Sequence, residues 1–172
     1  MPMYEVEHVT PLEPAQKDAL AQAITNIHST KFITPRLFVN VKFTDVSRQD
    51  AYVAGKRNHS NRVTGHVRRG PTRTRTEFDA LCDDIHLAWA SIVHPTHSTK
   101  PPADLELRAV FIVGEIITAS EAGFAVPTAG SDQAWVKQNL AAFKAKAREG
   151  DQDFVDLLAE LESRPEFKGI SQ

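Results

Sequence analysis

The residue best suited to take part directly in a reaction is Pro2, near the start of a chain that begins MPMYEVEHV. If Met1 is removed, Pro2 carries a free secondary amine on a rigid ring. Amino-terminal amines titrate around pH ~8, so such a group can act as a general base or acid near neutral pH. A proline at position 2 is common, however, and its meaning has to be judged from the rest of the chain.

A second feature is the segment from Lys56 to Arg75, which contains no acidic residue. Its seven basic residues are Lys56, Arg57, Arg62, Arg68, Arg69, Arg73 and Arg75. Three interpretations are open: an arginine clamp for a small carboxylate, a nucleic-acid contact, or a solvated edge whose charges pair with acidic neighbours such as Asp83 and Asp84. A nucleic-acid surface normally carries several stacking aromatic residues, and Tyr52 is the sole candidate here.

Other polar residues offer weaker signals. His28 falls near the end of a predicted helix, where a histidine commonly caps the helix, and Glu121 falls in a predicted loop as a possible general base. His94 and His97 could ligate a metal, but Pro95 breaks the helical spacing and no third ligand is evident. We find no glycine-rich phosphate loop and no motif around a serine or cysteine nucleophile. We therefore expect no metal site.

The elements that would position these residues begin with a strand, a helix and a strand. Alternating side chains predict a strand over Met3–Val9. Apolar residues at helical spacing predict a helix over Glu13–Lys31, and renewed alternation predicts a strand over Leu37–Thr44. The first third of the chain thus forms a β-α-β unit.

The same order returns later in the chain. We predict a strand over Arg62–Arg69, a helix over Thr74–His94 and a buried strand over Leu105–Ile116. Strands joined by a helix favour parallel pairing with a right-handed crossover. The expected class is therefore α/β, an α+β sandwich in which two β-α-β units form one sheet with both helices on one face.

The remaining segments are predicted as loops and short helices. The polar stretch 46–61 is expected to be a loop or a short hairpin around Tyr52 and Val53, and 118–132 a loop. Two short helices with apolar stripes should follow, and the terminal RPEFKGISQ should be a loose end. We assign residues 1–130 to one domain with units 1–46 and 62–117, and residues 131–172 to a helical extension.

Composition limits the function classes. The chain has 172 residues, a formal net charge of -2, 41% hydrophobic and 24% charged residues, which favours a globular protein without a general affinity for nucleic acid or membranes. Cys82 is the sole cysteine, so no intrachain disulfide can form, and no secretory signal precedes the first strand. We expect a cytoplasmic protein.

Five segments carry a resemblance to a known family. They are Pro2-Met3-Tyr4, AQAITNIH ending at His28, LFVNVKF, GHVRRGPTRT, and VFIVGEI followed by SEAGF. In this order and spacing, the chain from Pro2 to about Gly130 resembles the tautomerase superfamily, and within it the group of cis-3-chloroacrylic acid dehalogenase. The resemblance implies β-α-β units, a catalytic amino-terminal proline, a homotrimer, and no metal or organic cofactor.

The resemblance also implies roles for single residues. Pro2 would be the catalytic amine, His28 a substrate-binding residue, Arg68 a carboxylate-binding arginine and Glu121 the acid that activates water. Arg73 would be the second arginine if two residues are inserted before it.

Two points of this correspondence remain open. Arg69 competes with Arg73 for the role of second arginine. The family's tyrosine on the last strand is missing, because Phe111 and Ile112 lie where it should be, and neither can donate a hydrogen bond.

The implied function is a proline-dependent tautomerase or hydratase that acts on a small 2-keto, enol or unsaturated carboxylic acid. A cis-3-haloacrylate dehalogenase or a related decarboxylase is the alternative enzyme. A non-catalytic trimeric binding protein of the same fold is the alternative from another class. Which of these applies depends on the protonation state of Pro2 and the position of Glu121, and neither can be derived from the sequence.

Overall fold

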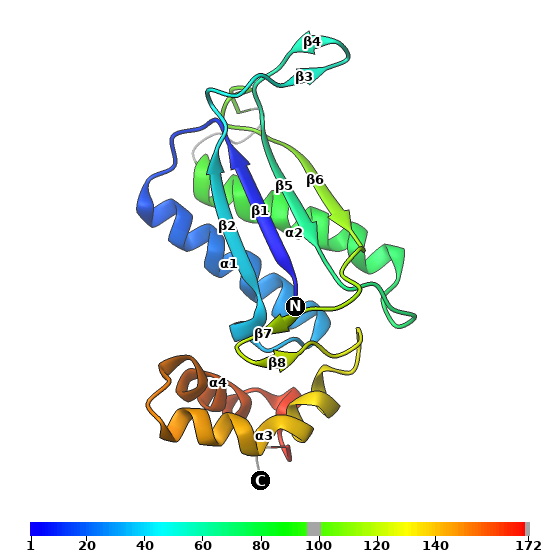
Figure 1. Ribbon diagram of the computed structural model, residues 1–172. Helices are drawn as coiled ribbons and strands as arrows, with labels where there is room; N and C mark the ends of the chain where they lie inside the picture. Colours follow the sequence, from blue (N-terminus) through cyan, green and yellow to red (C-terminus); the bar gives the residue numbers. More distant parts are fainter. Residues whose placement is uncertain (96–100, 171–172) are drawn as a thin grey trace.

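A four-stranded mixed sheet forms the centre of the protein in the computed structural model, which describes residues 1–95 and 101–170 (Figure 1). Its strands are β1 (Met3–His8), β2 (Asn40–Asp45), β5 (Asn61–His66) and β6 (Leu107–Val113), in the order β2-β1-β5-β6. Strands within a unit are parallel, β1 with β2 and β5 with β6, whereas β1 and β5 pair antiparallel where the two units meet.

Two long helices, α1 (Pro14–Phe32) and α2 (Arg75–Val93), cover one face of the sheet (Figure 1). Local sequence explains their starts: Pro14 occupies the first turn of α1, and Thr74 forms a capping box with Glu77 ahead of α2. The core between sheet and helices is built on alternate strand residues such as Tyr4 and Val6 and on apolar helix residues. The predicted fold class, with two β-α-β units and both helices on one face, is confirmed.

Several predicted boundaries shift. The residues expected to start the second strand form instead a 3₁₀ turn, η1 (Arg36–Phe38), which buries Phe38 away from the sheet core. Strand β5 ends at His66, three residues earlier than predicted, although the Val67 N–H still donates to the carbonyl oxygen of Val113 at 2.8 Å. The expected hairpin around Tyr52 and Val53 is confirmed as β3 (Tyr52–Val53) and β4 (Lys56–Arg57).

A second small hairpin interrupts the segment predicted to be a loop. Strands β7 (Ser120–Glu121) and β8 (Phe124–Ala125) pair antiparallel across Ala122 and Gly123, both with positive φ. Two left-handed central residues are typical of a two-residue turn that matches the twist of a hairpin. The hairpin places Glu121 on a defined strand at the edge of the sheet's lower end in Figure 1.

The chain then forms α3 (Asp132–Arg148), α4 (Gln152–Ser163) and a 3₁₀ turn, η2 (Pro165–Phe167), below the sheet in Figure 1. These elements form a second apolar cluster. Its buried members are Met1, Phe38, Trp135, Val136, Phe143, Phe154, Leu157, Leu161 and Phe167. The prediction of a loose chain end is wrong for residues 164–167, because burial of Phe167 under the guanidinium of Arg164 fixes this segment.

The end of α1 connects the sheet domain to these helices. Ile33, the residue after α1, adopts a left-handed conformation with φ 53°. The next residue, Thr34, is buried, and its carbonyl oxygen accepts a hydrogen bond from Arg164. Among the described residues, no helix combines the length and apolar character needed to cross a membrane.

Candidate active site

The antiparallel pairing of β1 with β5 brings the start of the chain next to the arginine segment. Met3 lies opposite His66, so Pro2 lies at the same end of the sheet as Arg68, just past the end of β5. The backbone N–H of Asn40 donates to the carbonyl oxygen of Pro2 at 3.1 Å. Figure 1 shows the amino terminus at this end, beside the β7–β8 hairpin.

The terminal amine lies in a charged and buried environment. Burial lowers the pKa of the Met1 α-amino group from 8.0 to about 5. Arg68 and Arg73 also lower the pKa of this amine, whereas Asp132 and Glu121 raise it. Pro2 is buried too, so removal of Met1 would expose the Pro2 amine to the same groups. Such surroundings favour a neutral amine at pH 7.

His28 on α1 forms a buried hydrogen bond with Tyr4 on β1. The Tyr4 hydroxyl and His28 Nδ1 are 2.7 Å apart, and both side chains are fully buried. Burial raises the pKa of Tyr4, so the hydroxyl keeps its proton and is able to donate to Nδ1. We assign His28 the tautomer that accepts this hydrogen bond, in which the proton of the neutral imidazole lies on Nε2 and makes Nε2 a hydrogen-bond donor.

The pKa of His28 predicts how stability depends on pH. Burial, then the positive charges of Arg73 and Arg68, lower the pKa of His28 well below 6.5. The unfolded chain binds a proton at His28 below pH 6.5 that the folded protein does not bind. The contribution of His28 to the free energy of unfolding should therefore be constant above pH 6.5. As the pH falls below 6.5, the free energy of unfolding should decrease by up to about 1.4 kcal/mol per pH unit.

Urea unfolding of wild-type and His28→Gln protein between pH 5 and pH 8 checks this expectation. The variant should lose this part of the pH dependence. His59→Gln is the matched control, because His59 is exposed, and it should keep the wild-type slope. An unchanged slope in His28→Gln would show that His28 is not held neutral.

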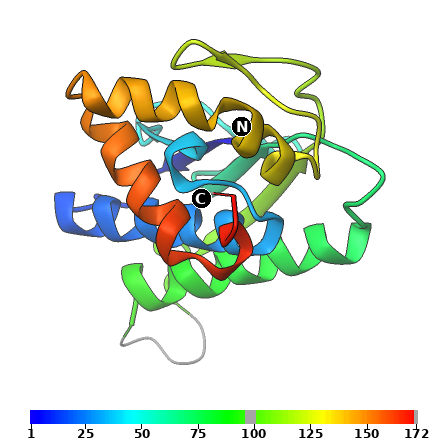
Figure 2. The same ribbon diagram turned by 90° about the horizontal axis from the view of Figure 1, so that it is seen from below.

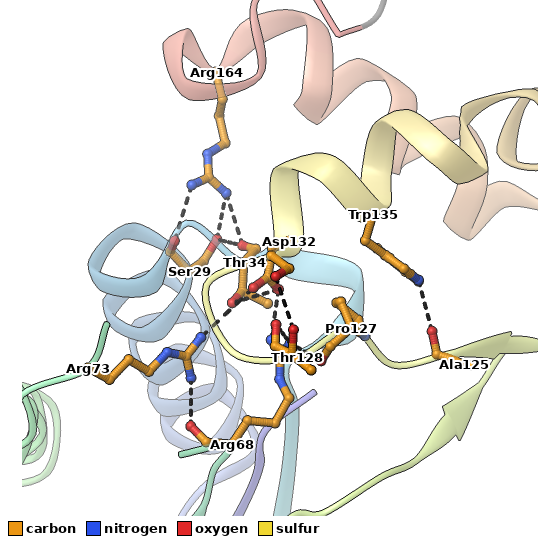
Figure 3. Close-up of polar contacts among 11 residues, drawn as sticks. Ser29, Thr34, Arg68, Arg73, Ala125, Pro127, Thr128, Asp132, Trp135 and Arg164 are labelled. Carbon is orange, nitrogen blue, oxygen red and sulfur yellow. Dashed lines mark hydrogen bonds and ion pairs between the residues drawn. The ribbon is translucent and has the colours of Figure 1, made fainter. Parts of the chain in front are cut away.

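Arg68 forms a buried ion pair with Asp132, the first residue of α3 (Figure 3). Arg68 Nη2 donates to Asp132 Oδ1 at 2.7 Å, and both side chains are about 5% exposed. Its other terminal nitrogen, Nη1, donates to the carbonyl oxygens of Pro127 and Thr128 at 2.6 and 3.2 Å. Asp132 therefore holds one side of the arginine that we expected to bind a substrate carboxylate.

Arg73 lies in the same cluster, and Arg69 does not. Arg73 Nη1 donates to the carbonyl oxygen of Arg68, and its Nη2 is 4.0 Å from Asp132 Oδ2 (Figure 3). The Arg73 guanidinium also stacks 4.4 Å over the Phe32 ring. Arg69 is exposed, packs on Gly114 and lines a hollow of about 400 Å³ between α2 and β6, which Arg73 also lines. By position, Arg73 is the second arginine of the cluster.

Glu121 reaches the same end of the sheet through Asn40. The side-chain amide of Asn40 donates to Glu121 Oε1 at 3.0 Å, and the backbone of Asn40 holds Pro2. The structure thus brings Pro2, His28, Arg68, Arg73 and Glu121 to one end of the sheet.

A family comparison matches this arrangement. Residues 1–140 match the family model Tautomerase_3, described as "Putative oxalocrotonate tautomerase enzyme". The chain belongs to this tautomerase family. The predicted membership of the tautomerase superfamily is confirmed. No curated protein sequence matches the chain.

Solved structures of the same fold also resemble this tautomerase family member. The crystal structure of N1, a member of the cis-3-chloroacrylic acid dehalogenase family, is 20% identical, covers 90% of this chain and 99% of its own, and has a TM-score of 0.63. RhCC from Rhodococcus jostii RHA1 is 21% identical over 80% of this chain and 96% of its own, with a TM-score of 0.55. A fused 4-OT, an asymmetric trimer, is 15% identical over 72% and 94%, with a TM-score of 0.54. At these identities the likeness establishes the fold.

Phe111 and Ile112 of β6, which stand where the family has a tyrosine, lie on opposite faces of the sheet. Phe111 is 55% exposed on the face of the sheet that the helices leave open. Ile112 lies on the helix face, where it meets Tyr4 above Gly65. A Cβ on Gly65 would lie 2.7 Å from the Tyr4 ring, so this glycine leaves the room that Tyr4 needs to reach His28.

Two residues of this candidate site were not predicted. Tyr4 belongs to the first segment that resembles the family, but the resemblance implied no role for it. Its hydrogen bond to His28 joins β1 to α1. Asp132 is the last residue of the segment predicted as a loop, and no role was predicted for it. Nothing in its local sequence indicated the contact with Arg68.

No cluster of ligands for a metal ion occurs in the part of the chain that the structure describes. His94, the first of the two histidines considered as ligands, is buried at the end of α2. His97 lies outside the described residues.

Proposed function

We propose that this protein is a tautomerase that uses the amine of Pro2, freed by removal of Met1, to move a proton within a small 2-keto, enol or unsaturated carboxylic acid. The observation that carries this proposal is the buried position of Pro2 at the end of the sheet where Arg68, Arg73 and Glu121 act on the terminal amine. There burial, and then Arg68, lower the pKa of the Met1 amine, and we expect the arginines to act on the Pro2 amine in the same direction. A neutral amine is a base, and a base is what enol tautomerisation needs first.

The chemistry balances without a cofactor. The neutral nitrogen of Pro2 takes the proton of the enol hydroxyl while the C–O bond becomes a carbonyl. The ammonium form of Pro2 then gives a proton to the neighbouring carbon as the C=C bond is lost, and the amine is neutral again. Arg73, Arg68 and the Nε2–H of His28 are the donors that would hold the carboxylate and stabilise the enolate oxygen.

Hydration or dehalogenation of an unsaturated acid is the second candidate. Glu121 favours it, because this carboxylate lies beside the amine and is oriented by Asn40, as activation of water would require. In that reaction Pro2 has to be protonated when substrate binds. The same burial that makes the amine a base works against that state.

We infer a homotrimer as the working assembly. The open face of the sheet carries exposed Met3 and Phe111, 41% and 55% exposed, which a partner subunit would cover. The trimeric fused 4-OT of the same fold supports this inference.

The pH dependence of the rate tests the role of Pro2. For protein whose intact mass shows loss of Met1, kcat/KM for enol tautomerisation should stay constant above the pKa of the Pro2 amine and fall below it. The two arginines that lower the pKa of the Met1 amine should also hold the pKa of the Pro2 amine below the usual value of about 8, so the fall should begin below that pH. Stopped-flow loss of enol absorbance measures it. A rate that rises as pH falls would show that protonated Pro2 is the active form and would favour hydration.

A further inference from the structure

The ion pair between Arg68 and Asp132 changes the charge that a substrate meets. Two guanidinium groups, Arg68 and Arg73, face two carboxylates, Asp132 and Glu121, around the terminal amine. A site with both arginines uncompensated would attract dianions. In this protein α3 already supplies one carboxylate to the arginines, so a substrate with two carboxylates would bring its second charge close to Asp132.

The unused hydrogen-bonding atoms of the site define what a ligand has to offer. Four buried atoms near the amine have no hydrogen-bond partner among the described residues. They are Arg68 Nε, Arg73 Nη2, His28 Nε2 and Asp132 Oδ2, of which Arg73 Nη2 and Asp132 Oδ2 face each other as an ion pair at 4.0 Å. With His28 in the assigned tautomer these are three donors and one acceptor. A single carboxylate and one enol hydroxyl supply three acceptor oxygens and one donor, which matches this set.

The rest of the ligand would meet an apolar surface. The side chain of Met1 is 5% exposed and belongs to the apolar cluster that α3 and α4 form with Phe38. The Trp135 ring packs against Phe38 at 5.1 Å, and its N–H is already bonded to the carbonyl oxygen of Ala125 (Figure 3). Removal of Met1 would leave this apolar space next to the Pro2 amine.

We propose that Asp132 determines the substrate specificity of this site: by neutralising Arg68 it selects an enol or unsaturated acid with one carboxylate, whose apolar tail fills the space that Met1 vacates. The proposal rests on the proposed function, and it names the class of substrate for the same site. The helical extension thereby supplies both the charge and the apolar wall that distinguish substrates.

Binding of two unreactive acids tests the proposal without turnover. Isothermal titration calorimetry on protein lacking Met1 would compare 3-phenylpropionate, with one carboxylate and an apolar tail, and succinate, with two carboxylates. We expect the wild type to bind 3-phenylpropionate at least about tenfold more tightly. Equal or tighter binding of succinate would overturn the proposal, whatever the behaviour of any variant.

The variant Asp132→Asn tests whether Asp132 causes the selectivity. The ratio of the dissociation constant of succinate to that of 3-phenylpropionate should be about tenfold smaller in the variant than in the wild type. Asp153→Asn is the matched control, because Asp153 lies in the first turn of α4 and is exposed, and it should keep the wild-type ratio. A wild-type ratio in folded Asp132→Asn would also overturn the proposal. If Asp132→Asn does not fold, the wild-type ratio alone decides.

Failure of the selectivity proposal can be distinguished from failure of the proposed tautomerase function. The same titrations on Pro2→Ala protein require no catalysis and should show the wild-type preference. Catalytically active Pro2→Ala protein would refute the proline mechanism and leave the selectivity intact, whereas a lost preference in an active wild type would refute only the role of Asp132.

Discussion

Replacement of Pro2 by alanine should lower kcat/KM for enol-acid tautomerisation by about 10²- to 10⁴-fold, the range that general acid–base groups contribute. The fold should be unaffected, because the Pro2 carbonyl that pairs with Asn40 is retained. The loss should appear mainly in kcat, since the arginines that would bind the carboxylate are untouched. Enol decay followed by absorbance, together with circular dichroism, measures both properties.

Two controls complete this experiment. Pro11→Ala changes an exposed loop proline and should leave the rate at the wild-type level. A protein with a short extension ahead of Pro2 should be as inactive as Pro2→Ala, because its proline nitrogen is an amide. Wild-type rates in both Pro2 proteins would reject the mechanism and favour a non-catalytic binding protein.

Replacement of Arg68 by methionine should destabilise the protein by up to about 3–5 kcal/mol, because it leaves the buried carboxylate of Asp132 with Arg73, 4.0 Å away, as its remaining cation. Arg68 and Asp132 are each about 5% exposed, so little solvent is available to compensate. Urea unfolding at pH 7 measures the change. Arg148→Met is the matched control: Arg148 is exposed at the end of α3, and its loss should change stability by less than about 0.5 kcal/mol.

The double variant Arg68→Met/Asp132→Leu separates stability from function. Apolar residues of similar size replace the ion pair, so most of the lost stability should return. Tautomerase activity should remain low, because the substrate carboxylate loses one donor. Restored activity in this variant would show that Arg68 serves the fold alone, whereas a cost below about 1 kcal/mol in Arg68→Met would contradict the buried pair.

Much of the fold could be predicted because it is encoded locally. The alternation of Tyr4 and Val6 marks β1, and apolar residues at helical spacing mark α1 and α2, so period alone assigns them. The helical crossovers then require parallel pairing within each unit. Two-residue strands have no measurable period, so the β7–β8 hairpin was missed and the β3–β4 hairpin was predicted only as an alternative to a loop.

The candidate site could be predicted only in part. Pro2, His28, Arg68, Arg73 and Glu121 came from the order of short segments that resemble the family, and the structure brings them together. The choice between Arg69 and Arg73 depends on the turn after β5, which no local pattern encodes. The pairing of Arg68 with Asp132 joins residues far apart in the chain, and sequence periodicity carries no information about such contacts.

The left-handed conformation of Ile33 has a consequence for how the molecule comes apart. A β-branched residue in this conformation costs roughly 1–2 kcal/mol of backbone strain. That strain persists because Thr34, the next residue, bonds to Asp132 at the start of α3 and to Arg164 after α4. If the extension undocks, Ile33 is free to relax and the last turn of α1, which carries His28, loses its anchor. We therefore expect the extension and the sheet domain to unfold together in one cooperative transition.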